Sequence, residues 1–178
     1  MKPGQKFRNA LKNNKPLIIP GTINAYSAKL AELANHNSIY LSGSGVAAAS
    51  YGLPDLGVTT LENVLIDAKR ITSATSLPLL VDIDTGWGDF DAISNTIIEM
   101  GNANVAAVHI EDQIFDKRCG HRPNKQLVSI DEMQDRLKAA LDAKIDDSFF
   151  IMARTDALAS EGIEKAIERC GKYLDVGA

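Results

Sequence analysis

Residues 77–110 have the sequence LPLLVDIDTGWGDFDAISNTIIEMGNANVAAVHI. The stretch begins and ends with short apolar runs, Leu77–Val81 and Val105–Ile110, which have the length and composition of buried strands. Between them, Asp89–Met100 carries Phe90, Ile93, Ile97 and Met100 at helical spacing. Continuous apolar strands on either side of an amphipathic helix are typical of a parallel sheet covered by helices. The stretch therefore predicts an α/β fold.

The same alternation continues in both directions along the chain. Two capping boxes, Thr59–Glu62 and Ser129–Glu132, indicate further helix starts. The pattern predicts five strands, at Leu17–Pro20, Ser38–Ser42, Leu77–Val81, Val105–Ile110 and Phe149–Ala153. It predicts helices at Ala25–His36, after Thr59, at Asp89–Met100, after Ser129 and around Ile163–Leu174, with long connections at Gly43–Thr60 and Glu111–Val128.

Five β/α units fit two architectures. They could form an open flavodoxin-like sheet, or they could be the first five units of an eight-stranded (β/α)8 barrel, which needs about 250 residues. The sequence contains no linker or low-complexity tract, so we expect residues 1–178 to form one domain.

Composition excludes several classes of protein. The chain has 178 residues, of which 45% are hydrophobic and 24% charged, and its net charge of −4 argues against a general nucleic-acid binder. No apolar run approaches the length of about 20 residues that spans a bilayer. Two cysteines do not make a disulfide framework. These observations predict a cytoplasmic protein.

The expected strands end in polar residues, and ligands bind at this edge of parallel α/β sheets. Asp82 and Asp84 are two residues apart, so on a strand both carboxylates would leave the same face. Two converging carboxylates repel each other unless a cation lies between them, and oxygen ligands suit Mg²⁺. Glu111 and Asp55 strengthen this interpretation, although solvated loop aspartates would carry the same sequence pattern.

The connection from Glu111 to Val128 contains one cysteine in a basic cluster, KRCGHRPNK at 117–125. A thiol among cations is favoured as a thiolate or as a proton donor. The alternative is a solvated basic loop. Cys170, in contrast, lies in an apolar helical pattern and is expected to be buried, and His109 is expected to be a packed core histidine.

Six stretches of the chain match a known family: YLSG (40–43), GLPDLG (52–57), VDIDTGWG (81–88), HIEDQ (109–113), KRCGHRPNK (117–125) and MARTDA (152–157). Over essentially its whole length the chain resembles the isocitrate lyase/phosphoenolpyruvate mutase superfamily. Within that superfamily it is most similar to the branch that cleaves 2-methylisocitrate, because the lyases carry the cysteine motif and the mutase and phosphonate branches generally do not.

This resemblance implies a (β/α)8 barrel, of which the chain supplies about five units, and Mg²⁺-dependent, reversible cleavage of 2-methylisocitrate into pyruvate and succinate. It implies that Asp82 and Asp84 are the metal residues and that Cys119 is the general acid that protonates the succinate carbanion. Asp55 and Glu111 would support the metal through water.

The resemblance also implies the substrate contacts and the partners. The substrate is a small tricarboxylate, the full-length protein is a homo-oligomer, usually a tetramer, and neither nucleic acid nor membrane is a partner. The residues implied to contact the substrate are Ser42, Gly43 and Ser44 on the pyruvate side, together with Gly120 and Arg154.

A barrel of this family needs three more β/α units after Ala178. We therefore expect the sequence to be a C-terminally truncated part of a lyase, inactive or poorly soluble on its own. Three other readings are an isocitrate lyase, an inactive remnant that retains the motifs, and a flavodoxin-like binding module. The last is disfavoured because the segment after the first strand, Gly21–Ala25, lacks a glycine-rich phosphate loop.

Overall fold

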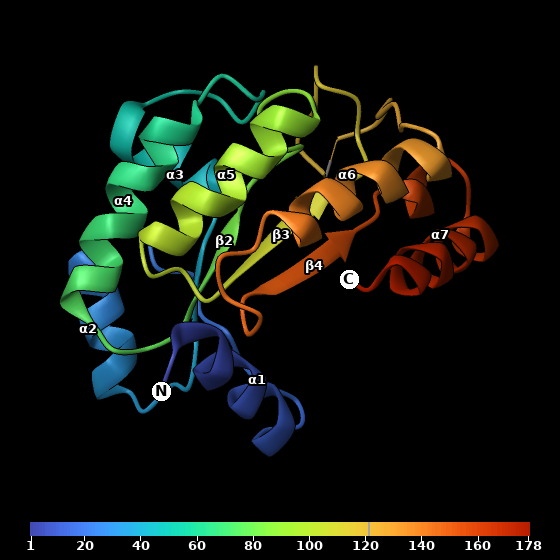
Figure 1. Cartoon of the computed structure of the whole chain (residues 1–178). Coiled ribbons are helices and arrows are strands. Elements are labelled where there is room, and N and C mark those ends of the chain that lie inside the picture. The colour runs from blue at the N-terminus through green and yellow to red at the C-terminus, as the bar shows by residue number, and fades with distance from the viewer. Residues whose placement is uncertain (121) are drawn as a thin grey trace.

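The computed structural model of the chain describes residues 1–120 and 122–178. Four parallel strands alternate with helices (Figure 1). The strands are β1 (Ile39–Leu41), β2 (Leu79–Asp82), β3 (Ala107–Glu111) and β4 (Phe150–Arg154). The helices are α1 (Pro3–Asn13), α2 (Ala25–Leu33), α3 (Gly43–Tyr51), α4 (Leu61–Ala74), α5 (Phe90–Asn102), α6 (Ile130–Asp142) and α7 (Ile163–Val176), with a short 3-10 helix η1 (Ala157–Ala159) before α7.

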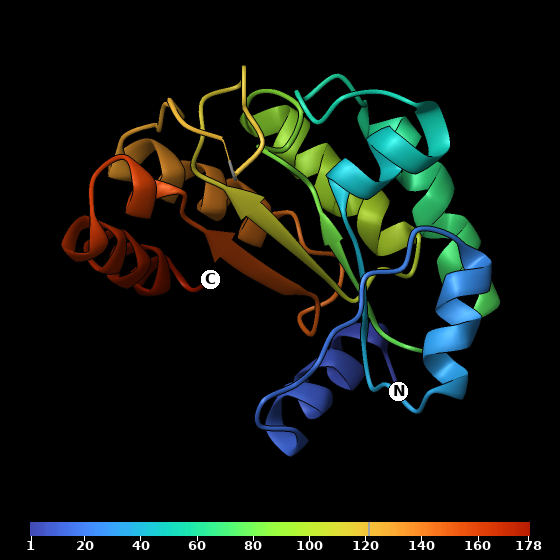
Figure 2. The ribbon, with the colours of Figure 1, turned by 180° about the vertical axis from the view of Figure 1, so that it is seen from behind.

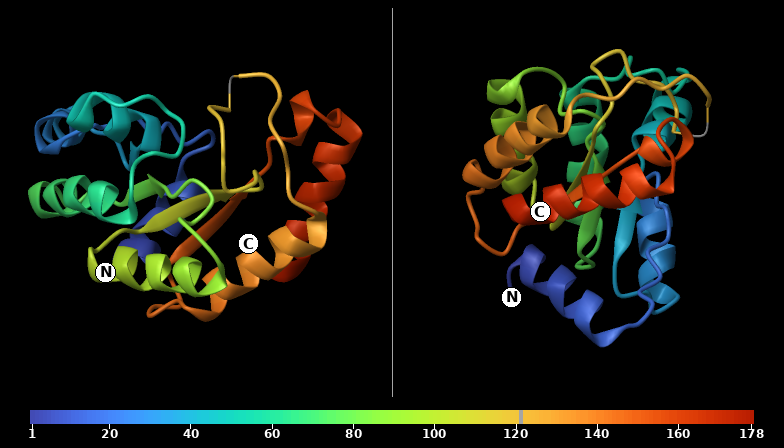
Figure 3. Two further views of the ribbon diagram at one scale, coloured as in Figure 1. Left: turned by 90° about the horizontal axis from the view of Figure 1, so that it is seen from above. Right: turned by 90° about the vertical axis from the view of Figure 1, so that its right-hand side faces the viewer.

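The strands lie in sequence order, β1-β2-β3-β4, and every pair is parallel. The predicted α/β fold with a parallel sheet is confirmed. Helices α4, α5, α6 and α7 follow one another in an arc on one side of this sheet (Figure 3). From behind, the strands are seen with no helix across them (Figure 2). This one-sided arrangement leaves the other face of the sheet to the functional side chains.

Alternation along the strands builds two separate clusters of apolar side chains. Ile39, Val81, Val108 and Ile151 belong to the large core between sheet and helices. On the opposite face, Leu80 and Ala107 pack with Phe7 of α1. Helix α1 lies below the sheet, where its Phe7 ring stands 5.5 Å from the Phe150 ring of β4. Helix α1 thus covers the amino-terminal end of the open face and leaves its carboxyl end to other segments of the chain.

The strand expected at Leu17–Pro20 is absent, so the prediction of five strands is wrong for the described residues by one. This segment only touches β1: the Tyr40 amide donates to the Pro20 carbonyl at 3.0 Å, and the Thr22 amide donates to the Tyr40 carbonyl at 2.7 Å. Prolines at both 16 and 20 remove two amide donors, which prevents a continuous ladder.

Two local predictions also need correction. The connection expected at Gly43–Thr60 contains helix α3, which Ser42 caps by accepting a hydrogen bond from the Gly45 amide. The capping box of α4 is formed by Thr60 and Asn63, one residue later than the predicted Thr59. Thr59 is buried, and its carbonyl accepts a hydrogen bond from Trp87 Nε1 at 2.8 Å.

Helix α7 exposes the face that its sequence pattern assigns to the core. Cys170, expected to be buried, is exposed, as are Ile163, Ile167 and Leu174. The apolar spacing was recognised correctly, but these side chains have too few neighbours among the described residues to bury them. Within the described part of the chain, no helix is long and apolar enough to cross a bilayer.

Candidate functional site

The open face of the sheet collects polar side chains at the carboxyl ends of its strands. Tyr40, Asp82, His109, Glu111 and Arg154 all occupy positions that alternate with core residues. The strand register pairs Asp82 with His109 and Glu111 with Arg154. Parallel pairing therefore brings residues from four separate segments of sequence to one edge of the sheet.

Asp82, the last residue of β2, is held by hydrogen bonds from its own chain. One carboxylate oxygen, Oδ2, accepts from the Gly43 amide at 3.2 Å and from the Tyr40 hydroxyl at 3.3 Å. The other oxygen, Oδ1, accepts from the Asp84 amide at 3.1 Å. These bonds orient the carboxylate at the beginning of α3.

Asp84 lies beyond the end of β2, in a turn with the left-handed φ of 49°, so the expectation that both aspartates leave one face of a strand is wrong. The turn nevertheless returns its side chain to Asp82. A Cβ built on Gly43 would be 3.3 Å from Asp84 Oδ1 and 3.4 Å from Asp82 Oδ2. Both carboxylates therefore flank the same small space beside a glycine.

Burial is the main electrostatic influence on Asp84. It raises the pKa of this carboxyl to about 6, and the neighbouring charge of Asp82 adds to the increase while Lys117 opposes it. Asp84 Oδ1 is buried and has no hydrogen bond of normal geometry among the described residues. Its close neighbour is the Lys117 ammonium, in an ion pair at 2.5 Å.

Lys117 comes from the long connection between β3 and α6, and its side chain is only 6% exposed. Besides Asp84, its ammonium meets Asp55 Oδ1 at 2.8 Å. Burial alone would lower the pKa of Lys117, but the two aspartates reverse that effect and raise it above its ordinary value. The acidic residues at the strand ends and the basic connection are therefore in direct contact through Lys117.

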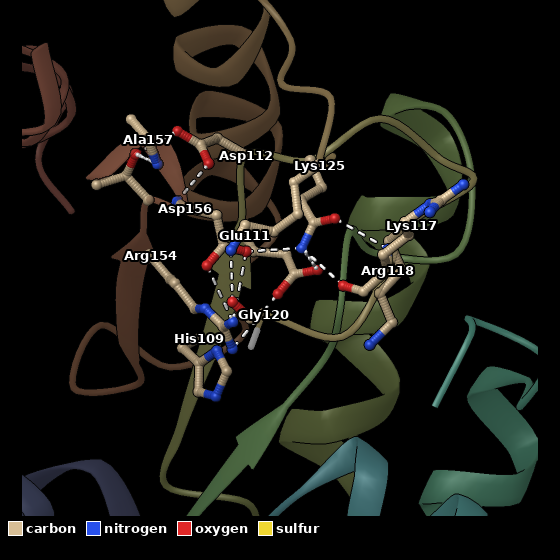
Figure 4. A network of polar contacts seen from close by, with 12 residues as sticks. His109, Glu111, Asp112, Lys117, Arg118, Gly120, Lys125, Arg154, Asp156 and Ala157 are labelled. Carbon is tan, nitrogen blue, oxygen red and sulfur yellow. Dashed lines mark hydrogen bonds and ion pairs between the residues drawn. The ribbon is translucent and has the colours of Figure 1, made fainter. Parts of the chain in front are cut away.

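Glu111 and Arg154 form the second half of the site (Figure 4). Arg154 Nη1 lies 3.4 Å from Glu111 Oε2, and Nη2 lies 3.1 Å from Asp156 Oδ1. Burial raises the pKa of Glu111 to about 8 in spite of the Arg154 charge. A carboxyl with that pKa can give or take a proton near neutral pH.

His109 is buried and packed, as expected, and its side chain lies among the polar residues at the strand ends. Its ring stacks on Tyr40 with centroids 5.6 Å apart, and its Nε2 lies 2.9 Å from the Tyr40 hydroxyl. Its Nδ1 is 3.7 Å from Asp82 Oδ1. Burial lowers the pKa of His109 and is the largest influence on it. The sequence signal for this position was its spacing of two residues from Glu111 on one strand.

The connection 112–129 crosses the carboxyl ends of the strands and carries the predicted cysteine. We call residues 114–120 and 122–127 the lid, because the bridge between Gln113 and Leu127 joins its two ends. Cys119 lies in the lid with intermediate exposure, between Lys117 and Gly120. A Cβ on Gly120 would collide with Arg154 Nη2, so the structure brings these two predicted residues together. His121 of the basic cluster lies outside the described residues.

Gln113 is a residue that sequence reasoning missed. Its side-chain oxygen accepts from the Arg118 amide at 2.9 Å, while its nitrogen donates to the Arg118 carbonyl at 2.9 Å. The same nitrogen lies 3.0 Å from Glu111 Oε1 and 2.6 Å from Asp156 Oδ2. Gln113 thereby links the lid, next to Cys119, to the two acids beside Arg154.

A buried network behind the site was also missed. Asp112 is fully buried and accepts hydrogen bonds from Thr155 Oγ1 at 2.6 Å, from the Asp156 amide at 3.0 Å and from the Tyr173 hydroxyl at 2.9 Å. Arg169 Nη1 stands 3.4 Å from the same carboxylate. The network fixes the turn after β4, which carries Thr155 and Asp156 and directly follows Arg154, to helix α7.

The remaining predicted residues, Ser42, Gly43 and Ser44, start helix α3. Their position after β1 places a helix amino terminus at the same edge of the sheet. The Gly43 amide is already bonded to Asp82, and Ser42 caps the helix. Ser44 is half-buried.

The donor set at Asp82 and Asp84 fits a magnesium ion. Among the described residues no group of three His, Cys, Asp or Glu side chains stands ready to ligate a metal. Mg²⁺ is commonly bound by only one or two carboxylates, with water completing its shell. The buried Asp84 oxygen without a hydrogen bond and the two carboxylates around Gly43 meet that requirement.

Comparison with known proteins identifies the family. The model of the family described as phosphoenolpyruvate phosphomutase matches residues 7–178. The chain belongs to this family. A curated member, the 2-methylisocitrate lyase of Shewanella oneidensis, is 62% identical over 175 residues, which are 98% of this chain and 60% of that protein.

Solved structures of other proteins have the same arrangement of strands and helices. An oxaloacetate acetylhydrolase with the inhibitor 3,3-difluorooxalacetate superposes with a TM-score of 0.94 at 37% identity, over 99% of this chain and 61% of its own. A phosphonopyruvate hydrolase complex with oxalate and Mg²⁺ gives 0.87 at 32% identity, over 100% and 61%. The chain spans about 60% of the length of its relatives and corresponds to part of their barrel fold.

Proposed function

We propose that this chain carries the metal- and thiol-bearing part of a Mg²⁺-dependent lyase that cleaves 2-methylisocitrate into pyruvate and succinate. The observation that carries the proposal is the pairing of two half-sites on one sheet edge. The Asp82–Asp84 carboxylates lie at one end of it, and the Cys119–Gly120 segment meets Arg154 at the other. The named relatives of this sequence support this substrate.

The two half-sites suit a substrate with several carboxylates and one hydroxyl group. Arg154 has a planar fork that binds a carboxylate with two hydrogen bonds, and its side chain is one-third exposed, so a ligand can reach it. The amino terminus of α3, at Ser42–Ser44, offers amide dipoles to the pyruvate half. A bound Mg²⁺ on Asp82 and Asp84 would stabilise negative charge on the oxygen of the pyruvate half.

Bond cleavage needs one proton removed and one proton supplied. A base takes the hydroxyl proton, the C–O bond becomes the pyruvate carbonyl, and the electron pair of the breaking C–C bond stays on the succinate carbon. The Cys119 thiol gives its proton to that carbon and becomes a thiolate. The positively charged lid stabilises this thiolate. In the same proposal the lid excludes water from the carbanion.

The test is an assay for the keto acid released, with Mg²⁺ or with EDTA. It is run on this chain and on the product of the whole reading frame that contains it. Pyruvate from 2-methylisocitrate, abolished by EDTA, supports the proposal. Preferential release of glyoxylate from isocitrate would instead assign an isocitrate lyase, and no release from either substrate by the whole product would refute both.

Cys119→Ser tests the role of the thiol. We expect the turnover number to fall by about 10²–10⁴, the contribution of a positioned general acid. Cys170→Ser is the matched control, because Cys170 is exposed on α7, outside both half-sites. The homotetrameric state and the cytoplasmic location belong to the same proposal.

A further inference from the structure

Lys117 occupies the place in the acidic half-site where a cation is needed. Its ammonium lies 2.5 Å from Asp84 Oδ1 and 2.8 Å from Asp55 Oδ1, and its side chain is 6% exposed. Asp84 is just as inaccessible, with a side-chain exposure of 6%. The positive charge of Lys117 is therefore buried among the carboxylates, whereas Arg118 and Arg122 of the lid are exposed.

The backbone around this contact is shaped to admit the lysine. A Cβ on Gly57, which has a left-handed φ of 67°, would lie only 3.3 Å from Lys117 Cγ. The loop that carries Asp55 thus passes close to the stem of Lys117. Lys117 is packed between this loop and the turn after β2, and it forms ion pairs with Asp55 and Asp84.

A divalent cation on Asp84 and the Lys117 ammonium cannot share this space. Mg²⁺ binds carboxylate oxygens at about 2.0–2.1 Å, and the lysine nitrogen already lies at contact distance from the Asp84 oxygen that has no other partner. Two cations a few ångströms apart in a buried site would repel each other strongly. Binding of the divalent ion to Asp84 therefore requires the Lys117 ammonium to move away.

We propose that Lys117 is the resident counter-cation of the metal site, and that a divalent ion and Lys117 compete for Asp84. Binding of the ion releases Lys117, and with it the part of the lid that carries Cys119. The inference rests on the proposed metal role of Asp82 and Asp84. Its new content is that the Lys117–Asp84 ion pair holds the lid when no metal is bound, and that metal binding breaks this ion pair.

Thermodynamic linkage makes this coupling reciprocal. An ion that displaces the Lys117 ammonium loosens the lid, and removal of the Lys117 charge makes Asp82 and Asp84 bind the ion more tightly. Cys119, two residues from Lys117, reports the position of this segment. Gln113 accepts a hydrogen bond from the Arg118 amide and donates one to the Arg118 carbonyl, between Lys117 and Cys119. Release of the Cys119 segment therefore also breaks these two hydrogen bonds, while the bridge between Gln113 and Leu127 keeps the ends of the lid in place.

The experiment follows thiol labelling of Cys119 in the whole chain carrying Cys170→Ser, so that one thiol remains. MgCl2 is titrated against NaCl of equal ionic strength, and Mg²⁺ affinity is measured in parallel by calorimetry. We expect the labelling rate to rise with Mg²⁺ and to reach half of its change at the calorimetric dissociation constant. A Cys119 labelling rate that does not change with Mg²⁺, while calorimetry detects Mg²⁺ binding, would overturn the inference. This outcome requires no lysine variant.

Lys117→Met removes the tether. We expect labelling to be fast without Mg²⁺ and unaffected by it, and Mg²⁺ to bind about tenfold more tightly or better, the change expected when a buried competing charge is removed. Lys138→Met is the matched control, since Lys138 is an exposed lysine on α6, outside the lid and both half-sites. It should leave Mg²⁺ affinity and the Mg²⁺ response unchanged.

The outcomes separate this inference from the proposed function. Equal Mg²⁺ affinity in the native and Lys117→Met chains would refute the competition and leave the metal site standing. No Mg²⁺ binding to either chain would refute the metal site itself, and the competition with it. Circular dichroism of each variant establishes whether it is folded. If Lys117→Met is not folded, the effect of Mg²⁺ on the labelling rate of the chain with native Lys117 tests the inference.

Discussion

At the scale of single residues, the site is defined by acids that the fold keeps out of water. Glu111 is 2% exposed, and its oxygens meet Arg154 and Gln113. Burial raises its pKa to about 8, from 4.5 for an ordinary glutamate. The folded chain therefore holds a proton on Glu111 that the unfolded chain has lost over this range of pH.

Glu111→Gln should remove this pH dependence. Because the folded state binds the proton more tightly, the native free energy of unfolding should fall as pH rises from 4.5 to about 8, by at most about 1.4 kcal/mol per pH unit from this group. Urea unfolding of both chains at several pH values in EDTA measures it. Parallel curves for the native chain and Glu111→Gln would contradict the shifted pKa.

Gly120→Ala tests the contact between the lid and Arg154. The added methyl group would collide with Arg154 Nη2, the movable end of a partly exposed side chain. We expect the guanidinium to move away from Asp156 at a cost in stability below about 1 kcal/mol. NMR of the Arg154 Nε–H group and thermal unfolding measure the two effects, and an unmoved resonance would refute the contact. Gly171→Ala, with open space around the new Cβ, is the control.

Strand-end positions such as Asp82 and Arg154 were predictable from sequence, because parallel strands always present their carboxyl ends at one edge. Lys117 and Gln113 were not. Their roles depend on contacts between the connection after β3 and residues that are distant in sequence, such as Asp55 and Asp156. Residue spacing along the chain does not predict these contacts. His109 was predictable as a packed histidine, and its alternation with Glu111 places it on the polar face.

At the scale of elements, helix α1 is positioned by a close approach of backbones. A Cβ on Gly4 would collide with the Ser148 carbonyl before β4. Arg8 Nε donates to the same carbonyl at 3.1 Å, and its guanidinium lies 4.8 Å from the centre of the Phe150 ring. The helix therefore docks against the sheet only with glycine at this position.

Gly4→Ala should destabilise the chain although alanine favours helices. The backbone atoms it would meet cannot rotate away, so we expect a loss of about 1–3 kcal/mol, as for overpacked cores. Gly171→Ala in α7 is matched in residue type and should be neutral or stabilising by up to about 1 kcal/mol. Urea unfolding compares the two, and equal midpoints would contradict the close docking of α1.

Periodicity predicted the four long covering helices and four of the strands. It failed where the local signal was weak. Helix α3 has the sequence GSGVAAASY, whose small residues resemble a loop, and it forms because Ser42 caps it and Val46 and Ala47 are buried against the core. Prolines at 16 and 20 changed a predicted strand into a segment with two hydrogen bonds to β1.

At the scale of the whole molecule, an apolar surface runs along α7 and the adjoining edge of the sheet. Ile163, Ile167 and Leu174 are each more than half exposed, and β4 pairs with β3 as an outer strand of the described sheet. Exposed apolar faces and open strand edges favour association.

The chain should therefore self-associate as its concentration rises, and Ile167→Glu with Leu174→Glu should reduce that association. Both side chains are exposed, at 64% and 69%, so the double variant should keep the native unfolding midpoint. Sedimentation velocity at several concentrations measures the effect. A native chain that stays monomeric throughout would contradict the prediction.

The central claim is that carboxylates gathered at the end of β2 form a site for a divalent cation. Mn²⁺ titration followed by electron paramagnetic resonance tests it most directly, because bound and free ions give separate signals. We expect one site in this chain, lost in Asp84→Asn and retained in Glu164→Gln on α7, where the removed acid is exposed. Absence of binding in the native chain, or equal binding in Asp84→Asn, would contradict the account.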